Sequence, residues 1–137
     1  MDRILTALQQ GLPVLVEQFA VTLALLGAGI VCYMILTPFN EWRLVRQGNV
    51  AAGIVIAGTL VALAIPLAAT LAASVLTLDI LLWGIMALAI QLATFVAATV
   101  LIRGLRAMIE AGNVAAALVL IGIQIAVALL NAGAMSG

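Results

Sequence analysis

The sequence predicts an all-α integral membrane protein, with four transmembrane helices built from two parallel copies of a two-helix repeat. Three observations support this prediction. The 137-residue chain is 67% hydrophobic and 7% charged, with a mean hydropathy of +1.39, which is too apolar for a surface in contact with water. Its few charged residues divide it into long apolar runs, and a five-residue string opens two of these runs.

The repeated string is Gly-Asn-Val-Ala-Ala, found at 48–52 and again at 112–116, which is 64 residues later (113 − 49 for the asparagines). The same register pairs three further small or branched residues: Val55 with Val119, Gly58 with Gly122, and Ala62 with Ala126. The chain is therefore expected to divide into an outer segment 1–18, repeat one at 19–73, an outer link 74–79, and repeat two at 80–137.

The outer segment 1–18 is apolar but interrupted by Gln9, Gln10, Gly11, Pro13 and Glu17. Because it is short and polar for a membrane-spanning helix, we expect a separate helix lying at the outer membrane interface.

Four spans follow, at 19–36, 50–73, 80–102 and 114–131. Each has at least the roughly 18 apolar residues typical of a transmembrane helix, which rises about 1.5 Å per residue across a hydrocarbon core of about 30 Å. The runs lack the polar/apolar alternation of a transmembrane barrel.

Arginines set the expected orientation, because basic residues near short loops are retained in the cytoplasm. Arg43 and Arg46 follow span one, and Arg103 and Arg106 follow span three. We therefore expect the two Gly-Asn loops in the cytoplasm and both termini outside. A two-span repeat returns the chain to its starting side, so the duplication predicts the same arrangement.

The two loops also form a candidate site. Asn49 and Asn113 are good N-cap residues for the helices that follow them. Both helix amino ends would then direct positive dipoles toward the four arginines, and this arrangement suits an anion or an anionic lipid headgroup. The alternative is that the asparagines only cap and the arginines only set topology. Arg106 and Glu110 are spaced for an i, i+4 pair.

The span interiors carry little polarity. No Asp, Glu, Lys, Arg or His lies in the middle of a span, so a proton relay of the usual kind and a charged midplane site are not expected. Gln91 and Gln124 lie at similar depth and are expected to form an interhelical hydrogen bond; a permeation role is the alternative. The first repeat has Gly27 and Leu60 at these positions.

Catalytic and metal-binding sets are missing from the sequence. It has no histidine, a single cysteine at Cys32, and no pair of acids in one expected site. We therefore expect no enzyme activity, no metal and no cofactor, and no nucleic-acid partner. Spans rich in Ala and Gly favour close helix contacts, so a homo-oligomer is expected.

Several short motifs in combination resemble the bacterial membrane-protein family known as domain of unknown function 350. The resemblance extends from about Phe19 to Met135. The motifs that carry it are Thr37-Pro38, Asn40-Glu41-Trp42, Gly48-Asn49, Ala51-Ala52, Gly58, Ile65-Pro66-Leu67, Asp79, Trp83, Gln91-Leu92, Phe95, Asn113, Ala115-Ala116 and Asn131-Ala132. The resemblance implies a small four-span protein of the bacterial inner membrane without a settled activity, and an association with envelope-stress genes.

Two functions of different classes follow from these observations. The first is a non-enzymatic, oligomeric module that maintains the envelope by binding lipid or an unidentified protein partner through its cytoplasmic loops. The second is a small ion channel or transporter, for which the sequence supplies only Gln91, Gln124, Thr59 and Thr94 as polar candidates along a path.

Overall fold

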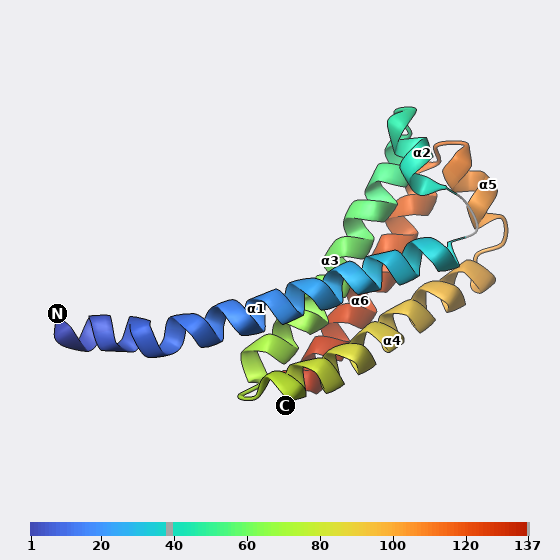
Figure 1. Cartoon of the computed structure of the whole chain (residues 1–137). Coiled ribbons are helices and arrows are strands. Elements are labelled where there is room, and N and C mark those ends of the chain that lie inside the picture. Colours follow the sequence, from blue (N-terminus) through green and yellow to red (C-terminus); the bar gives the residue numbers. More distant parts are fainter. Residues whose placement is uncertain (38–39, 137) are drawn as a thin grey trace.

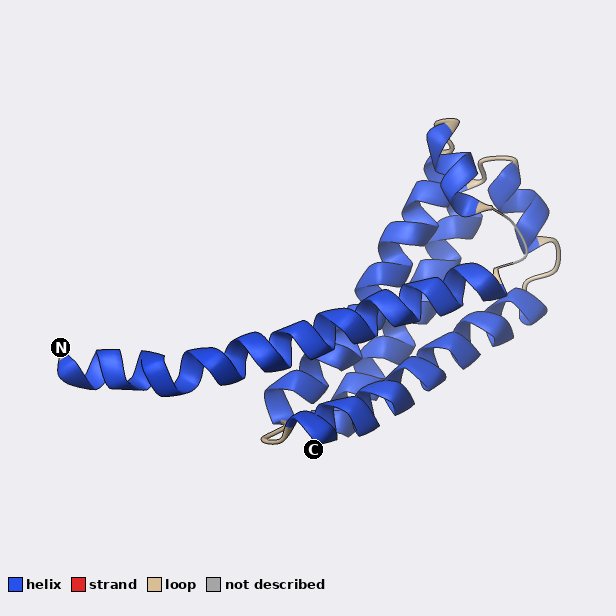
Figure 2. Ribbon diagram, in the orientation of Figure 1, coloured by secondary structure: helices blue, strands red, loops and turns tan. Residues whose placement is uncertain are grey.

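A computed structural model describes residues 1–37 and 40–136, and Pro38 of the motif and Gly137 of repeat two lie outside this part of the chain. Figures 1 and 2 show helices joined by short loops. The helices are α1 (Asp2–Leu36), α2 (Glu41–Arg46), α3 (Val50–Ala73), α4 (Thr77–Leu101), α5 (Leu105–Glu110) and α6 (Val114–Ser136). Within the described residues, α1, α3, α4 and α6 are long and apolar enough to cross a membrane.

The backbone follows the sequence duplication. The helices α2 and α3 begin 64 residues before α5 and α6, respectively. Two residues after each short helix lies a glycine with positive φ, 82° at Gly48 and 80° at Gly112, a conformation that L side chains rarely adopt. The next asparagine then caps the long helix, with Asn49 Oδ1 accepting from the Ala52 amide (3.0 Å) and Asn113 Oδ1 from the Ala116 amide (3.1 Å).

The two loops lie at one end of the bundle, with α2 beside α5, and the turn between α3 and α4 lies at the other end near the C-terminus (Figure 1). We call these the α2/α5 end and the far end. This geometry agrees with the expectation that both Gly-Asn loops lie on one side, but it does not say which side of the membrane that is.

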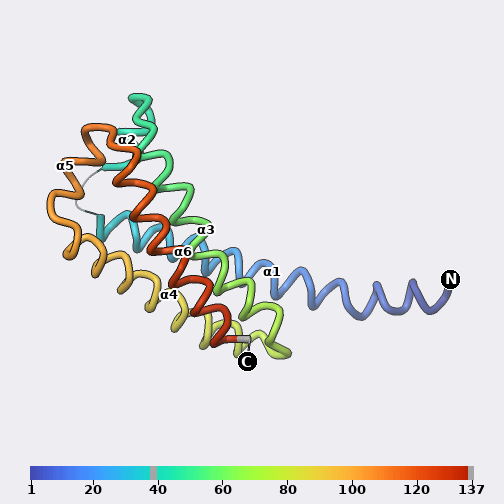
Figure 3. The backbone as a smooth tube through the Cα atoms, turned by 180° about the vertical axis from the view of Figure 1, so that it is seen from behind, coloured from blue at the N-terminus to red at the C-terminus, as the bar shows by residue number. Residues whose placement is uncertain are grey.

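Helix α3 is the centre of the bundle. It packs against α6 along its length and also contacts α1 and α4, and Figure 3 shows α3 and α6 running side by side. The closest approach is at Gly58, where an added Cβ would collide with the branched side chain of Ile121. A small residue at this position therefore brings α3 and α6 together.

Two apolar clusters fill the core. The cluster toward the α2/α5 end includes Tyr33, Val55, Phe95, Ile109 and Leu120, and the other includes Leu25, Leu63, Leu67, Ile80 and Leu88. Apolar side chains outside these clusters, such as Leu23, Ile85 and Leu129, are exposed on the bundle surface, as expected where lipid is the solvent.

The expected separate segment 1–18 is instead continuous with span one. Helix α1 runs for 35 residues with Pro13 inside it, and Thr22 Oγ1 donates to the Gln18 carbonyl across the expected junction (2.7 Å). No turn-forming residue follows Glu17, so nothing there stops the helix. Residues 1–17 are exposed, and this part of the chain projects from the bundle (Figure 1).

The other boundaries differ by a few residues. The link between the repeats is 74–76, because α4 begins at Thr77, and Asp79 therefore lies in its first turn. Span three ends at Leu101. Span four continues past Asn131 to Ser136, because Asn131 is buried against α4 within the helix.

Candidate functional site: a basic pocket joined to a buried polar column

The first residue of α2 points into the protein. Asn40 Oδ1 caps this helix by accepting from the Arg43 amide (3.0 Å), so Glu41 falls in the first turn, where it is only 3% exposed. The Tyr33 hydroxyl donates to Glu41 Oε1. Tyr33 is itself fully buried, and its ring packs edge-on against Phe95 with 4.5 Å between centroids.

Burial makes Glu41 easier to protonate. Loss of solvent raises the pKa of Glu41 to about 7, and the hydrogen bond from Tyr33 partly offsets this increase. The second carboxyl oxygen, Oε2, is buried and has no partner among the described residues. Glu41 therefore changes its protonation state close to neutral pH.

An open pocket of about 690 Å³ lies in front of Glu41, between the end of α1, α2 and α5. Its charged lining residues are Glu41, Arg43, Arg106 and Glu110. Met34 of α1 and Thr37, which directly follows α1, line another part of the pocket. Asn40 and Gln47, which flank α2, also line it. The pocket thus combines two guanidinium groups, neutral polar groups and an apolar edge.

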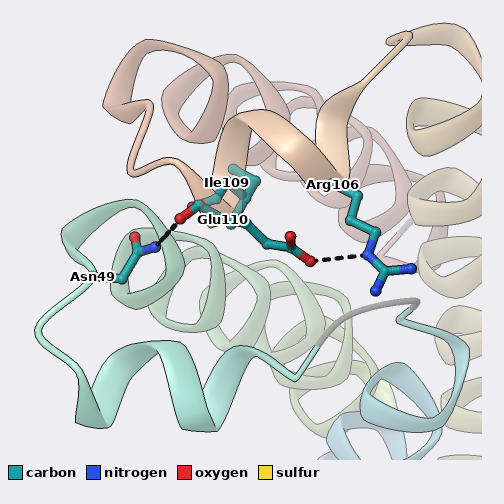
Figure 4. Close-up of polar contacts among 4 residues, drawn as sticks. All are labelled: Asn49, Arg106, Ile109 and Glu110. Carbon is teal, nitrogen blue, oxygen red and sulfur yellow. Dashed lines mark hydrogen bonds and ion pairs between the residues drawn. The ribbon is translucent and has the colours of Figure 1, made fainter.

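The two loops are tied together beside this pocket. Asn49 Nδ2 donates to the Ile109 carbonyl (2.8 Å) and more weakly to the Glu110 carbonyl (3.3 Å), as Figure 4 shows. Arg106 Nε pairs with Glu110 Oε1 at 2.9 Å, at the expected i, i+4 spacing and on an exposed face. Asn49 is therefore both a helix cap and a bridge between the repeats.

The structure brings only some of the predicted anion-site residues together. Arg43 and Arg106 line one pocket, whereas Arg46 lies over the Trp42 ring at 5.8 Å from its centroid and Arg103 lies in the loop before α5, away from the pocket lining. Asn113 is exposed, and its side-chain nitrogen has no partner among the described residues.

A second polar feature is buried inside the bundle. Thr59 Oγ1 donates to Gln124 Oε1 (2.9 Å), and Gln91 Nε2 donates to the main-chain carbonyl of Gln124 (3.2 Å). Asn131 Nδ2 donates to the Ala87 carbonyl (3.2 Å) and, weakly, to Gln91 Oε1 (3.4 Å). Gln91 and Gln124 thus lie together as expected, but the bond between them joins a side chain to the main chain.

We refer to the buried side chains of Glu41, Tyr33, Thr59, Gln124, Gln91 and Asn131 as the polar column. A cavity of about 10 Å³ lies between Tyr33, Thr59, Gln91 and Gln124, with Phe95 and other apolar residues completing its wall. Gln124 Nε2 and Asn131 Oδ1 are buried without partners among the described residues, as is Glu41 Oε2. Hydrogen-bonding capacity is therefore unused at both ends and in the middle of the column.

A third hollow lies at the far end. It measures about 270 Å³, and Thr70, Asp79, Trp83, Ala134 and Met135 are among its lining residues. Ala134 and Met135 follow Asn131 by one helical turn. The polar column therefore begins in one open pocket and ends one turn from another.

Sequence reasoning identified Gln91, Gln124 and Thr59 but missed Glu41, Tyr33 and Asn131 as buried polar groups. In the sequence, Glu41 stands out only as part of the motif Asn40-Glu41-Trp42, outside every apolar run. The duplication does indicate that Glu41 is buried, because the equivalent residue 64 positions later is Leu105, which is also buried. An apolar counterpart predicts that the position faces the core.

The four long apolar helices and the apolar surface define a multi-pass α-helical membrane protein. A family model described as Domain of Unknown Function (DUF350) matches residues 7–135, and the chain belongs to this family.

Two curated relatives share the same degree of similarity. The UPF0719 inner membrane protein YjfL of Escherichia coli K12 is 31% identical over 118 residues, which cover 86% of this chain and 89% of the relative. YjfL of Escherichia coli O157:H7 matches over the same extent. No solved structure matches the chain.

Proposed function

We propose that this protein is a non-enzymatic inner-membrane module that binds anionic lipid headgroups in the pocket at its α2/α5 end and contributes to envelope maintenance. The observation that carries the proposal is that Arg43 and Arg106, from different repeats, line one open pocket. Guanidinium groups suit phosphate because they present several donors in a planar fork.

The rest of the pocket fits an amphipathic ligand. The Arg43 guanidinium has no partner among the described residues, so its donors are free for a ligand. Thr37, Asn40 and Gln47 add neutral polar groups, whereas Met34 on α1 offers an apolar edge on the side of the membrane span. A headgroup in the pocket could thus keep its acyl chains beside α1.

The orientation is part of the proposal. We place the α2/α5 end in the cytoplasm and the termini outside, because four of the five basic residues lie at or beside α2 and α5. Anionic lipids of the cytoplasmic leaflet would then meet the pocket directly. Reporter fusions at Gly48, Gly112 and Ser74 test this orientation, and a cytoplasmic signal at Ser74 contradicts it.

Lipid retention tests the binding site. The double variant Arg43→Gln/Arg106→Gln is compared with Arg46→Gln/Arg103→Gln, which removes the same charge outside the pocket. Native mass spectrometry of protein purified with phosphatidylglycerol and cardiolipin should show loss of bound lipid only in the pocket variant. Equal loss in both variants would indicate general surface attraction, and retention in both would leave only a topology role for the arginines.

We also propose that the protein self-associates through the exposed face of α6. This face carries Ala115, Val119, Gly122 and Ala126, which are identical to residues that pack closely in α3. A Cβ added at Gly122 meets nothing within 4 Å, so a second helix can approach there. Mass measurement in detergent and in nanodiscs tests this, and a monomer in both refutes it.

Catalysis is not part of the proposed function. The buried carboxyl of Glu41 has Tyr33 as its partner, and no group of three potential metal-ligating residues occurs among the described residues. The protein is instead proposed to act by binding, with membrane lipid as the first partner and further protein partners left to experiment.

A further inference from the structure

The polar column has hydrogen-bonding capacity that the protein itself leaves unused. Three buried atoms, Glu41 Oε2, Gln124 Nε2 and Asn131 Oδ1, have no partner among the described residues. Leaving such groups unpaired is costly in a membrane interior, and ordered water is the usual solution. The unpaired atoms therefore mark positions where water would bind inside the bundle.

The cavity beside Gln124 has the size for this role. Its volume of about 10 Å³ is close to the smallest that holds one water molecule. Tyr33, Thr59, Gln91 and Gln124 are among its lining residues, and the Nε2 atom of Gln124 is buried without a partner among the described residues. This donor marks where one internal water would bind, because a buried polar group needs a hydrogen-bond partner.

Both ends of the column lead toward open hollows. Glu41 lines the large pocket at the α2/α5 end, and Asn131 lies one helical turn from the residues that line the far-end pocket. The column thus extends along most of the bundle, from the beginning of α2 to the last turns of α6.

The duplication shows that the fold does not require these polar groups. Each column residue has an apolar or glycine counterpart 64 positions away: Leu105 for Glu41, Ala97 for Tyr33, Ile123 for Thr59, Leu60 for Gln124, Gly27 for Gln91 and Leu67 for Asn131. The same helix unit is therefore built in this chain with apolar residues at every one of these positions. At each position only one of the two copies carries the polar residue: Tyr33, Glu41 and Thr59 come from the first copy, and Gln91, Gln124 and Asn131 come from the second.

We propose that the polar column, completed by internal water, is a path for protons between the two ends of the bundle. A proton from the large pocket binds the Glu41 carboxylate. The protonated Glu41 then passes a proton to the Tyr33 oxygen as Tyr33 releases its own hydroxyl proton to the cavity water. Tyr33 stays neutral, Glu41 returns to its carboxylate form, and the water carries the excess proton. Waters held by the amides of Gln124, Gln91 and Asn131 pass the excess proton on to water in the far-end pocket.

The surroundings of Glu41 support its place at the entrance. The charged groups that face it across the pocket are Arg43, Arg106 and Glu110, and Tyr33 is its direct partner. Burial raises the pKa of Glu41 to about 7, so the carboxyl can both accept and release a proton near neutral pH. The narrow cavity excludes a hydrated metal ion, so the path is specific for protons.

Proton flux into vesicles tests the path. The full chain is reconstituted into vesicles of phosphatidylethanolamine and phosphatidylglycerol that enclose a pH-sensitive dye, and a potassium diffusion potential is applied with valinomycin. We expect acidification faster than in protein-free vesicles, and the same rate when sodium replaces the other external cations.

Two matched variants identify the column as the route. Thr59→Val removes a column hydroxyl with little change in shape, and Thr94→Val removes a hydroxyl that bonds to its own helix outside the column. Flux should be lost in Thr59→Val and in Glu41→Gln but retained in Thr94→Val. Circular dichroism and gel filtration establish that each variant is folded, and Glu41→Gln covers the case in which Thr59→Val does not fold.

The opposite results overturn the proposal. Flux equal to that of protein-free vesicles would show that the column conducts no protons. Flux unchanged in folded Thr59→Val and Glu41→Gln would place any conduction elsewhere. Acidification that occurs only when sodium is present in the external medium would show a sodium-coupled path in place of a proton path.

Discussion

The same five-residue string leads into helices α3 and α6, but the two helices occupy different environments. Ala51, Val55, Gly58 and Ala62 are buried in α3, whereas their counterparts Ala115, Val119, Gly122 and Ala126 are exposed in α6. The reason is position, because α3 is packed against α1, α4 and α6, while α6 contacts mainly α3 and α4. Identical sequence in the two copies therefore does not imply identical energetic roles.

The largest expected difference between the two helices is at their paired glycines. Gly58→Leu places a side chain where even a Cβ collides with Ile121, so we expect a loss of about 3 kcal/mol or more of stability. Gly122→Leu enters open space and should leave folding intact. Thermal unfolding in detergent measures both, and equal destabilisation would contradict the different packing of α3 and α6.

The next comparison is between Glu41 and its apolar counterpart Leu105. The folded protein holds the Glu41 proton more tightly than the unfolded chain, whose ordinary pKa is 4.5, so stability falls as pH rises from about 4.5 to about 7 and is then constant. Glu41→Gln removes this cost while keeping an acceptor for Tyr33. It should stabilise the protein at pH 8 by on the order of 3 kcal/mol and have little effect below pH 4.5.

The matched control is Glu110→Gln, an exposed acid that lines the same pocket. Unfolding temperatures measured between pH 4 and pH 8 should depend on pH in the wild type and in Glu110→Gln, and much less in Glu41→Gln. A pH dependence that persists in Glu41→Gln would assign the titration to another group.

The paired caps should differ by a smaller amount. Asn113→Ala removes one cap and should cost about 1 kcal/mol. Asn49→Ala removes a cap and also the bonds to the Ile109 and Glu110 carbonyls, so we expect about 2 kcal/mol. Chemical unfolding of the two variants side by side provides the measurement. Equal costs would mean that the bridge from Asn49 to α5 contributes nothing.

The smallest effects are expected on the exposed faces of α2 and α5. In the first copy, Arg46 lies over the Trp42 ring. In the second copy, the equivalent positions hold Glu110 and Arg106, which form an ion pair. Both contacts are exposed, so Arg46→Gln and Arg106→Gln should each change stability by less than about 1 kcal/mol. A larger loss for either variant would show a contact that exposure alone does not predict.

Composition and periodicity predicted the helical membrane fold because they depend on summed apolar surface along the chain. The caps at Asn49 and Asn113 and the i, i+4 pair of Arg106 were also predictable, since each depends on residues within one turn. Helix ends were less predictable. Asn131 is polar and was expected to end a span, but its side-chain nitrogen donates inside the bundle to the Ala87 carbonyl and to Gln91.

The buried carboxyl could not be found from span composition. Glu41 lies outside every apolar run, and only the fold turns it inward to meet Tyr33, eight residues earlier. Likewise, the contact between Gln91 and Gln124 was expected from their depth, but the main-chain acceptor depends on helix rotation, which the sequence does not specify. Arg43 and Arg106 meet in one pocket only because α2 and α5 fold over the same end of the bundle.

Helix α1 is longer than one membrane crossing requires. At about 1.5 Å per residue its 35 residues extend for roughly 50 Å, far beyond a hydrocarbon core of about 30 Å. Only its second half packs in the bundle, and the first side-chain bonds that tie α1 to the rest of the chain are those of Glu17 and Gln18 with Thr77 and Val75. The same helix carries Tyr33, the partner of Glu41, near its other end, so one helix joins the projecting amino-terminal segment to the polar column.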